Sequence, residues 1–544
     1  MATVRRPTVT LLLLAFLALF FGLGRPAITD SDEGFYAEAS REMVETGDWL
    51  TPRFNYQDRW QKPVLYYWLT AATFTVSGTS EWGARLWSAL AGLGLVLLTR
   101  IAATRLYGRD DVGWLAGAIV ATAFGCFTMA RTALPDLPLA FCITLGVWAA
   151  IERRFALAGA AAGLGFLMKG PIALVVPGVI LLPIWWREGT WRTIRVADVF
   201  AALVPFAVIG LPWYVLMTME HGSEYVRSFF VGDNLERFAT DRFNAPRAWW
   251  FYLPIVIGGM MPWSAFLLVL PARPVMDVLS GRRRLEPTEW RLLLWAAAPL
   301  LFFTLSIGKQ PRYVLPVLVP VAILLARAIM VRVRPAAGEP VDHRGLALAS
   351  FATAALLALL AVLLFRAGPV LVNALPALTR VSVWALALAA LVVGTTAAAR
   401  RWSAIPTIMP AAAALVALAV RFGALAGVPT EPVENMAELI RAQRLAGEAV
   451  GQYHVFVRNL GFYLESPHAD LSDEASALEF IASSDRVLLV VSRPALAYLE
   501  AASGVPLVRL GEVRYLNTAN LRMRTLIEPD PEREIETVLL VANR

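Results

Sequence analysis

Long apolar runs separated by short polar connections occupy the first 430 residues of this chain. A helix that crosses a bilayer needs about 20 predominantly apolar residues, and thirteen runs approach that length. The first run follows Arg5 and Arg6 and resembles a signal peptide, but no small-residue cleavage site follows it, so we expect an uncleaved first helix. The predicted spans lie near residues 9–23, 84–104, 113–131, 137–152, 155–168, 171–186, 198–217, 248–271, 291–306, 313–331, 346–366, 380–398 and 404–427.

Arginine clusters mark every second connection between these spans. Loops rich in Arg stay on the cytoplasmic side of a membrane, so the clusters predict a cytoplasmic N-terminus. The remaining connections are then periplasmic, and they include a long first loop over residues 25–83. The clusters are Arg100, Arg105 and Arg109; Arg153 and Arg154; Arg187, Arg192 and Arg195; Arg282, Arg283 and Arg284; Arg332 and Arg334; and Arg400 and Arg401.

The tail over residues 430–544 has a different pattern. Helix-like segments alternate with short β-branched runs at Val455–Val457, Val487–Val491 and Val538–Val541. This alternation predicts a small α/β domain, which the topology places in the periplasm. We therefore expect a membrane domain over residues 1–429, followed by a periplasmic domain that serves as a lid or docking surface.

Composition supports a membrane protein. Hydrophobic residues make up 58% of the 544 residues, and the mean hydropathy is +0.58. Charged residues make up 17%, against roughly 25% in soluble domains. These values exclude a soluble, disordered or disulfide-stapled chain. The net charge of +7 is explained by loop arginines that fix orientation, so we expect membrane lipid and no nucleic acid as a partner.

Lysine is rare in this chain, although basic residues are not. Of 49 basic residues only three are lysines, namely Lys62, Lys169 and Lys309, and all three fall on the predicted periplasmic face. A compact ammonium group and a planar guanidinium are not interchangeable, so these positions are candidates for function. The alternative is chance survival of three lysines in a chain with an arginine-rich coding bias.

The first periplasmic loop carries the densest polar motif. Residues 33–45 have helical character, and Gly47 can end the helix. The loop reads D-E-x-x-Y-A-E-x-x-R-E-M-x-x-x-G-D-W-L-x-P from Asp32, and K-P follows at Lys62. Further motifs are L-P-D-x-P around Asp136, M-K-G-P at Lys169, F-F-x-x-x-N-x-E-R-F at 229–238 and G-K-Q-P-R-Y-V-L-P at 308–316.

Over about residues 1–330, this set of motifs resembles the bacterial GT-C glycosyltransferases. It is most similar to the lipid A aminoarabinose transferases and to the broader dolichyl-phosphate-mannose protein mannosyltransferase family. The resemblance implies a mainly α integral membrane protein of GT-C type, with interfacial helices in the first periplasmic loop and a small C-terminal α/β domain. It also implies a donor sugar carried on a polyprenyl phosphate.

The resemblance implies an inverting glycosyltransferase of the inner membrane. It would move an aminoarabinose-like sugar from undecaprenyl phosphate to lipid A or a related envelope glycan on the periplasmic side. A first alternative is another polyprenyl-phosphate sugar with a glycan or protein hydroxyl as acceptor. A lipid transporter is less favoured, because transporters place ionisable groups within their spans, whereas charge here gathers in the outer loops.

A lipid-linked sugar phosphate needs cations near its headgroup and acids near its anomeric carbon. Asp32 is the leading catalytic acid, as a general base for a hydroxyl acceptor or as an orienting group for a phosphate acceptor. Asp136 is the second candidate and Glu33 the third. Helix capping is the structural alternative for Asp32 and Asp136. The predicted substrate-binding residues are Lys62, Arg59, Tyr36, Lys169, Lys309, Arg312, Tyr313 and Arg237.

Three positions depart from the aminoarabinose transferase pattern. Gln61 stands where those enzymes generally carry Glu, Phe35 stands where they carry Arg, and Asn244 lies where a histidine is expected. A Glu and a His together would form a divalent-cation site, so their loss argues against a bound metal of that kind. The residues present therefore do not support a divalent cation, and the sequence identifies no certain cofactor. Arg59 is a candidate to replace the missing arginine charge.

Overall fold

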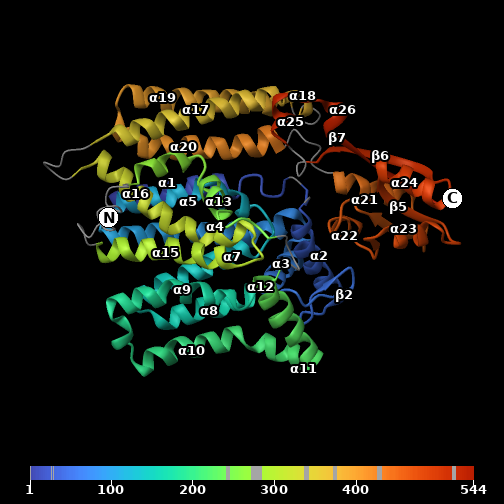
Figure 1. Ribbon diagram of the computed structural model, residues 1–544, viewed down its shortest axis with the longest axis horizontal. Helices are drawn as coiled ribbons and strands as arrows, with labels where there is room; N and C mark the ends of the chain where they lie inside the picture. The colour runs from blue at the N-terminus through green and yellow to red at the C-terminus, as the bar shows by residue number, and fades with distance from the viewer. Residues whose placement is uncertain are drawn as a thin grey trace.

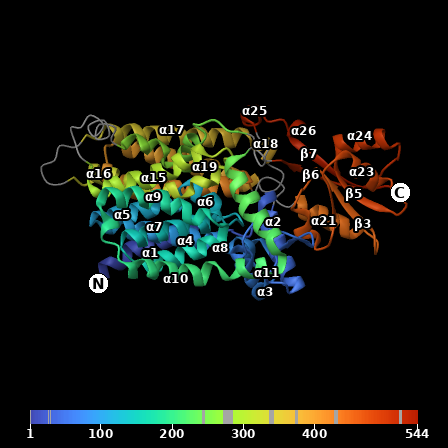
Figure 2. The same ribbon diagram turned by 60° about the horizontal axis from the view of Figure 1, so that its bottom comes forward.

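The computed structural model describes residues 2–25, 27–28, 30–240, 246–270, 285–335, 342–371, 376–425, 432–517 and 522–544. A long bundle of helices forms most of the molecule, and a smaller α/β unit, drawn in orange and red, lies at one end of it (Figures 1 and 2). The mainly α fold expected from the sequence is therefore confirmed.

The bundle is built from helices that run close to its long axis. The helices of its first half are α1 (Ala2–Leu19), α4 (Glu81–Tyr107), α5 (Asp110–Thr122), α6 (Phe124–Ala130), α7 (Asp136–Ile151), α8 (Phe155–Lys169), α9 (Ile172–Glu188), η1 (Thr190–Arg192), α10 (Val196–Gly210) and α11 (Pro212–Val226). Close packing depends on small residues: a Cβ atom added to Gly159 of α8 would lie 1.9 Å from the carbonyl oxygen of Ala202 in α10.

The second half of the bundle contains more irregular elements. They are η2 (Arg227–Glu236), α12 (Arg237–Ala239), α13 (Tyr252–Gly259), η3 (Trp263–Val269), α15 (Pro287–Leu305), η4 (Pro311–Val317), α16 (Leu318–Val333), α17 (Arg344–Arg366), α18 (Gly368–Leu371), α19 (Pro376–Ala398), η5 (Trp402–Ala404), α20 (Ile405–Leu418) and η6 (Ala419–Leu425).

The helices support a multi-pass membrane protein, but they do not confirm thirteen spans. In the described part of the chain, five helices are long and apolar enough to cross a membrane, and three bent pairs raise that number to eight. Predicted runs break where the backbone cannot continue a helix: at Ala123, whose conformation is extended, and before Pro212 and near Pro262, since proline has no N–H to donate. These pairs bend by 58°, 44° and 106°.

The first loop forms a small layer at one end of the bundle. It contains α2 (Ser31–Thr46), the two-stranded hairpin β1 (Arg53–Phe54) and β2 (Gln57–Asp58), and α3 (Leu65–Ser77). The expected helix ends at Gly47 as predicted, in a left-handed conformation with φ of 70°. The Oδ1 of Asp30 accepts hydrogen bonds from the backbone N–H groups of Asp32 and Glu33 at 2.8 and 3.1 Å. Asp30, and not Asp32, is therefore the N-cap.

The C-terminal α/β unit is built on a sheet. Within its described residues, five strands are ordered β4-β3-β5-β7-β6, and β3 pairs in parallel with β4 and β5. The strands are β3 (Ala449–Tyr453), β4 (Ala469–Leu471), β5 (Val487–Ser492), β6 (Val508–Leu516) and β7 (Ile535–Ala542). The helices are α21 (Pro432–Gln443), α22 (Leu460–Leu464), α23 (Glu474–Ile481), α24 (Arg493–Ser503), α25 (Met523–Ile527) and α26 (Pro531–Glu534).

Two of the three strands expected in this unit are correct. The runs at Val487–Val491 and Val538–Val541 fall in β5 and β7. The run at Val455–Val457 is not a strand, because the neighbouring His454 and the central Phe456 have φ of 53° and 54°, which is incompatible with extended backbone. That segment is a loop after β3.

Candidate active site

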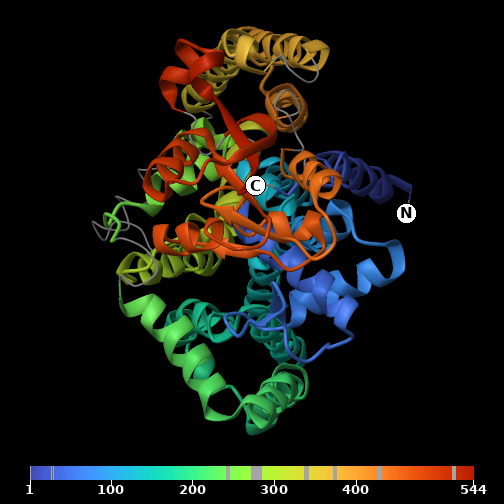
Figure 3. The same ribbon diagram turned by 90° about the vertical axis from the view of Figure 1, so that its right-hand side faces the viewer.

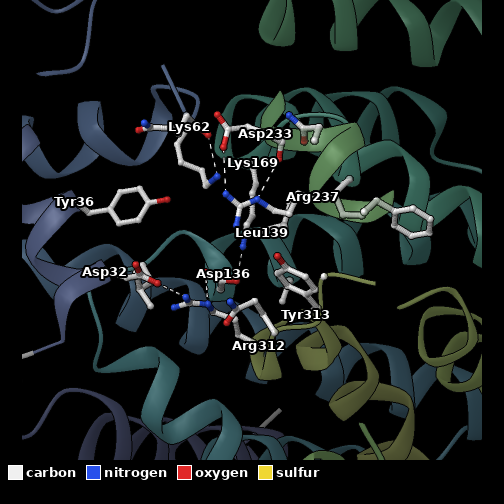
Figure 4. Close-up of a pocket in the computed structure, with 18 of the residues that line it drawn as sticks. Asp32, Tyr36, Lys62, Asp136, Leu139, Lys169, Asp233, Arg237, Arg312 and Tyr313 are labelled. Atoms are coloured by element: carbon white, nitrogen blue, oxygen red, sulfur yellow. Dashed lines mark hydrogen bonds and ion pairs between the residues drawn. The ribbon is translucent and has the colours of Figure 1, made fainter. Parts of the chain in front are cut away.

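A cavity of about 490 Å³ lies where the first loop covers the end of the helical bundle (Figure 4). Its walls come from α2, the 59–62 segment, α7, α8, α9, η2, α12, α15, η4 and the α/β unit. The residues are Asp32, Phe35, Tyr36, Arg59, Gln61, Lys62, Leu134, Asp136, Leu139, Ala140, Ile143, Lys169, Ile172, Phe229, Asp233, Asn234, Arg237, Phe238, Phe303, Ser306, Gly308, Gln310, Arg312, Tyr313, Pro316 and Arg458.

Two carboxylates face this cavity from the first turns of two helices. Asp32 lies in α2 and Asp136 begins α7. Arg312 joins them: it forms an ion pair with the Oδ2 of Asp32, and its Nε lies 3.9 Å from the Oδ2 of Asp136. The other oxygen of Asp136 accepts a hydrogen bond from the Nζ of Lys169 at 2.6 Å. Residues far apart in the sequence therefore form one charged network.

The position of Lys169 follows from the local backbone. Lys169 is the last residue of α8, where the negative end of the helix dipole favours a cation. Gly170 then turns the chain with φ of 75°, and a Cβ atom at this position would lie 2.8 Å from the Phe229 ring. The ammonium group of Lys169 also lies 5.2 Å from the centre of the Tyr313 ring, a cation–π contact.

A second group of charges lies beside the first (Figure 4). The Nη2 of Arg237 is 3.2 Å from the Oδ1 of Asp233, one helical turn earlier. Lys62 extends toward this pair, and its Nζ donates to the carbonyl oxygen of Gln61 at 2.9 Å. The cations of Lys62, Lys169 and Arg237 thus come from three separate segments of the chain.

Positive charge exceeds negative charge in the cavity. The described lining residues include six cationic side chains and three carboxylates. Burial, followed by repulsion from Arg237, lowers the pKa of Lys62 to about 7, although Asp233 acts in the opposite direction. Burial acts to raise the pKa of Asp32, but the charge and hydrogen bond of Arg312 outweigh it and hold that pKa below the ordinary 3.8. An anion entering this cavity would relieve the repulsion between the cations.

Aromatic rings hold the remaining predicted side chains. The Nε of Arg59 donates to the hydroxyl of Tyr67 at 3.0 Å, and its guanidinium lies 3.6 Å from the centre of the Phe35 ring. Tyr36 packs its ring between Tyr66 and Tyr67, with ring centres 5.4 and 5.2 Å away. These contacts fix Arg59 and Tyr36 along the wall that α2 contributes.

Two of the eleven predicted residues lie outside the cavity walls. Both oxygens of Glu33 accept hydrogen bonds from Arg85, at 2.7 and 3.0 Å, and Oε1 also accepts from the backbone N–H of Ala133 at 2.8 Å. The Nζ of Lys309 donates to the carbonyl oxygen of Ser306 at 2.6 Å. The Glu33 contacts are buried and join α2 to α4, whereas this contact of Lys309 lies within its own segment. The other nine predicted residues line the cavity.

Two charged residues of the cavity, Asp233 and Arg458, were not among the residues predicted from the sequence. Asp233 lies inside the motif at 229–238, four residues before Arg237, and this helical spacing is a signal that an acid and a base can pair. Arg458 belongs to the C-terminal tail, where the sequence has no local feature that points to a distant cavity.

The sequence predicts that the residues at Gln61 and near Asn244 do not form a divalent-cation site. Gln61 lines the cavity, and an amide there is a weaker metal ligand than a carboxylate. Asn244 lies outside the described residues. Among the residues that are described, no group of three His, Cys, Asp or Glu side chains is placed to hold a metal ion. The absence of a metal cofactor stays a prediction.

Comparisons with known proteins give one family match and a set of related sequences. The family model of dolichyl-phosphate-mannose-protein mannosyltransferase matches residues 9–221. The undecaprenyl phosphate-α-4-amino-4-deoxy-L-arabinose arabinosyl transferase 2 of Pseudomonas fluorescens is 34% identical over 380 residues, which cover 67% of this chain and 63% of that protein. The matched region thus spans slightly less than two thirds of that relative's length. The corresponding transferase of Pseudomonas savastanoi pv. phaseolicola is 31% identical over 366 residues, covering 65% of this chain and 67% of its own.

Solved structures extend the likeness to the whole chain. A crystal structure of ArnT from Cupriavidus metallidurans bound to undecaprenyl phosphate has a TM-score of 0.73 at 23% identity, covering 99% of this chain and 98% of that one. The oligosaccharyltransferase of Archaeoglobus fulgidus has a TM-score of 0.53 at 11% identity, covering 91% of this chain and 71% of that one. These likenesses confirm the GT-C fold.

Proposed function

This chain belongs to the family of undecaprenyl phosphate-aminoarabinose arabinosyl transferases, and on that basis we propose that it is a glycosyltransferase with a lipid-linked donor. The proposed donor is an aminoarabinose-like sugar on undecaprenyl phosphate. The proposed acceptor is lipid A or a related envelope glycan. One observation carries the proposal: a cavity at the end of apolar helices holds three carboxylates within an excess of cations.

The cations match the charge change of the reaction. The acceptor oxygen attacks the anomeric carbon, and the bond between that carbon and the donor phosphate oxygen breaks with inversion. The leaving undecaprenyl phosphate gains negative charge, which the cations of Lys62, Lys169 and Arg237 are arranged to stabilise. Because these groups are already held in place, little reorganisation is needed when the charge develops.

Asp32 and Asp136 line the same cavity, and Asp136 is in direct contact with Lys169. Asp32 is ionised at neutral pH, since its pKa is lowered by Arg312 despite burial. With a hydroxyl acceptor it would take the proton as the bond forms. With a phosphate acceptor no strong base is required, and Asp32 would orient the acceptor or stabilise positive charge at the anomeric carbon. Its low basicity favours the phosphate acceptor.

Apolar residues line part of the cavity, where they would contact the prenyl chain of the donor. Leu139, Ala140 and Ile143 lie on α7, and Ile172 lies on α9. A hydrocarbon chain gains about 0.8 kcal/mol for each CH₂ group that it buries against such surface. A polar, cationic end and an apolar wall in one cavity suit a phosphate that carries a long lipid.

The proposed location is the bacterial inner membrane, with the cavity and the α/β unit on the periplasmic side. The arginine clusters in alternate connections support this orientation. The domain boundary near residue 430 belongs to the same proposal, because the α/β fold begins at α21, directly after that position.

A second candidate keeps the lipid donor but changes the sugar and the acceptor. The mannosyltransferase family match and the departures at Phe35 and Gln61 support transfer of another sugar to a glycan or protein hydroxyl. A hydroxyl acceptor needs a base, so this candidate predicts a stronger dependence on Asp32 than the first one.

The test uses purified protein in lipid nanodiscs with undecaprenyl phosphate-aminoarabinose and lipid A. We expect release of undecaprenyl phosphate and a matching mass increase of lipid A. Mass spectrometry of lipid A from cells with and without the gene checks the acceptor. Release that requires a hydroxyl acceptor and leaves lipid A unchanged would favour the second candidate, and no release from any polyprenyl-phosphate sugar would refute both.

A further inference from the structure

Arg458 is the one cavity-lining residue that comes from residues 432–517 or 522–544, the described part of the α/β unit. It belongs to a loop over residues 454–459 that follows β3, here called the 454–459 loop. Three residues of this loop have positive φ: His454 at 53°, Phe456 at 54° and Arg458 at 70°. Positive φ is uncommon outside glycine, and three such residues so close together are stable only where the surroundings hold them.

The surroundings that hold this loop belong to the first loop of the chain. A Cβ atom added to Gly34 of α2 would lie 2.5 Å from the carbonyl oxygen of Arg458 and 2.3 Å from the Oδ1 of Asn459. A side chain at position 34 would therefore push the loop away. Glycine permits direct contact between the backbone of α2 and the backbone of the 454–459 loop.

Hydrogen bonds from residues that follow the loop in the chain reinforce this docking. The hydroxyl of Tyr463 accepts from the backbone N–H of Ile28 at 2.6 Å and donates to the Oε1 of Glu81 at 3.0 Å. The side chain of Asn55 donates to the carbonyl oxygen of His468 at 2.7 Å. Figures 1 and 3 show the α/β unit across this end of the bundle, with α22 beside α2.

Arg458 reaches the leading catalytic acid from this docked loop. Its Nη1 lies 3.5 Å from the Oδ1 of Asp32, while Arg312 contacts the Oδ2 of the same carboxylate. Its guanidinium also lies 4.2 Å from the centre of the Phe35 ring, which Arg59 contacts at 3.6 Å. Both oxygens of Asp32 are thus held, one from within the bundle and one from the α/β unit.

We propose that Arg458 is a positioning residue of the active site, by which the α/β unit fixes the direction of the Asp32 carboxylate. This inference rests on the proposed function. According to this inference, the α/β unit contributes a side chain to the active site in addition to covering it. The role is one of geometry rather than stability, because the side chain of Arg458 is 39% exposed and ion pairs at such exposed sites contribute little to stability.

The expected effect of Arg458→Ala is a loss of about 10- to 100-fold in kcat, since misplacing a reacting group by about 1 Å costs up to about 100-fold. Removing one positive charge beside Asp32 also raises the pKa of that carboxyl, so the acid limb of the pH profile moves to higher pH. Arg458→Lys keeps the charge, so its acid limb stays near that of the wild type. Its kcat is restored only in part, because lysine lacks the planar fork.

The experiment measures undecaprenyl phosphate release by the full-length protein in nanodiscs from pH 3 to pH 8, a range that includes the acid limb set by Asp32. The matched control is Arg493→Ala, which breaks an exposed ion pair with Glu512 elsewhere in the α/β unit. The docking control is Tyr463→Phe, which removes the hydroxyl that binds Ile28 but leaves the cavity walls unchanged. Thermal unfolding of each variant is recorded in parallel.

A loss of kcat with a moved acid limb in Arg458→Ala, and neither change in Arg493→Ala, supports the inference. Wild-type kcat and pH profile in Arg458→Ala overturn it and leave the proposed function intact. If Arg458→Ala and Tyr463→Phe lose kcat equally, with lower unfolding temperatures and unmoved acid limbs, then Arg458 only helps to dock the α/β unit. That result would also overturn the inference. The wild-type protein is measured first. If it is inactive, the proposed function itself is refuted.

Discussion

The protonation of Lys62 offers the sharpest test of the donor site. With a pKa of about 7, the free site carries a charged ammonium on nearly all molecules at pH 6, and on about a tenth of them at pH 8. The donor phosphate is a diester, so its own charge stays constant over this range. The neutral amine binds the phosphate far more weakly than the charged ammonium does, so the affinity for the donor should fall about 5- to 10-fold from pH 6 to pH 8.

Removing the ammonium group of Lys62 by mutation should also lower the affinity for the donor. A hydrogen bond to a charged group contributes about 1.5–3 kcal/mol, so Lys62→Ala should weaken donor binding about 10- to 150-fold at pH 6. Lys62→Arg is the matched control, because its guanidinium stays charged up to pH 8 and its affinity should not follow the wild-type pH dependence. It should restore only part of the affinity, since a fork replaces a point charge.

The assay is a titration of the donor into protein in nanodiscs at pH 6, 7 and 8, with turnover prevented by leaving out the acceptor. Wild-type affinity that is equal at pH 6 and pH 8 would contradict the assignment of Lys62 to the donor phosphate. So would a Lys62→Ala protein that is folded and binds the donor as tightly as the wild type.

Three further predictions concern the acids and the topology. Asp32→Asn keeps the shape of the side chain but removes its charge, and turnover should fall about 10²–10⁴-fold if Asp32 is the general base; wild-type turnover in the purified variant would make Asp32 structural. Glu33→Gln leaves the buried Arg85 without its counter-charge, so we expect a loss of about 3–5 kcal/mol of stability, measured by denaturant unfolding; an unchanged midpoint would refute it. A reporter that works only when exported should be active after residue 430, and one that works only in the cytoplasm should be active near residue 285; the opposite pattern at both sites would overturn the orientation.

The sequence by itself determined the class of protein and most of the cavity residues. The apolar runs are too many and too long for a soluble fold, and the polar motifs fall where those runs end. Lys169 is an example: it closes an apolar helix next to a glycine and a proline, so its place at the mouth of the bundle follows from local chemistry. Residues at the ends of neighbouring helices meet because a bundle brings its ends together.

Tertiary structure decided which of these side chains face one another. Asp32 and Glu33 are neighbours in α2, but successive residues of an α-helix point about 100° apart. Asp32 therefore faces the cavity and Arg312, while Glu33 faces Arg85 inside the fold. No pattern of residues in the loop distinguishes these two directions, because the partners lie 280 and 52 residues away.

The same reason explains Arg458. Its position in the cavity depends on a strained loop, on the absence of a side chain at Gly34, and on hydrogen bonds between segments several hundred residues apart. The sequence gives little signal for any of these contacts, because an arginine in a polar tail can adopt many conformations that point into solvent. The docking of the α/β unit on α2 selects the conformation in which Arg458 reaches Asp32. The direction of a side chain is set by packing between elements and not by the order of residues along the chain.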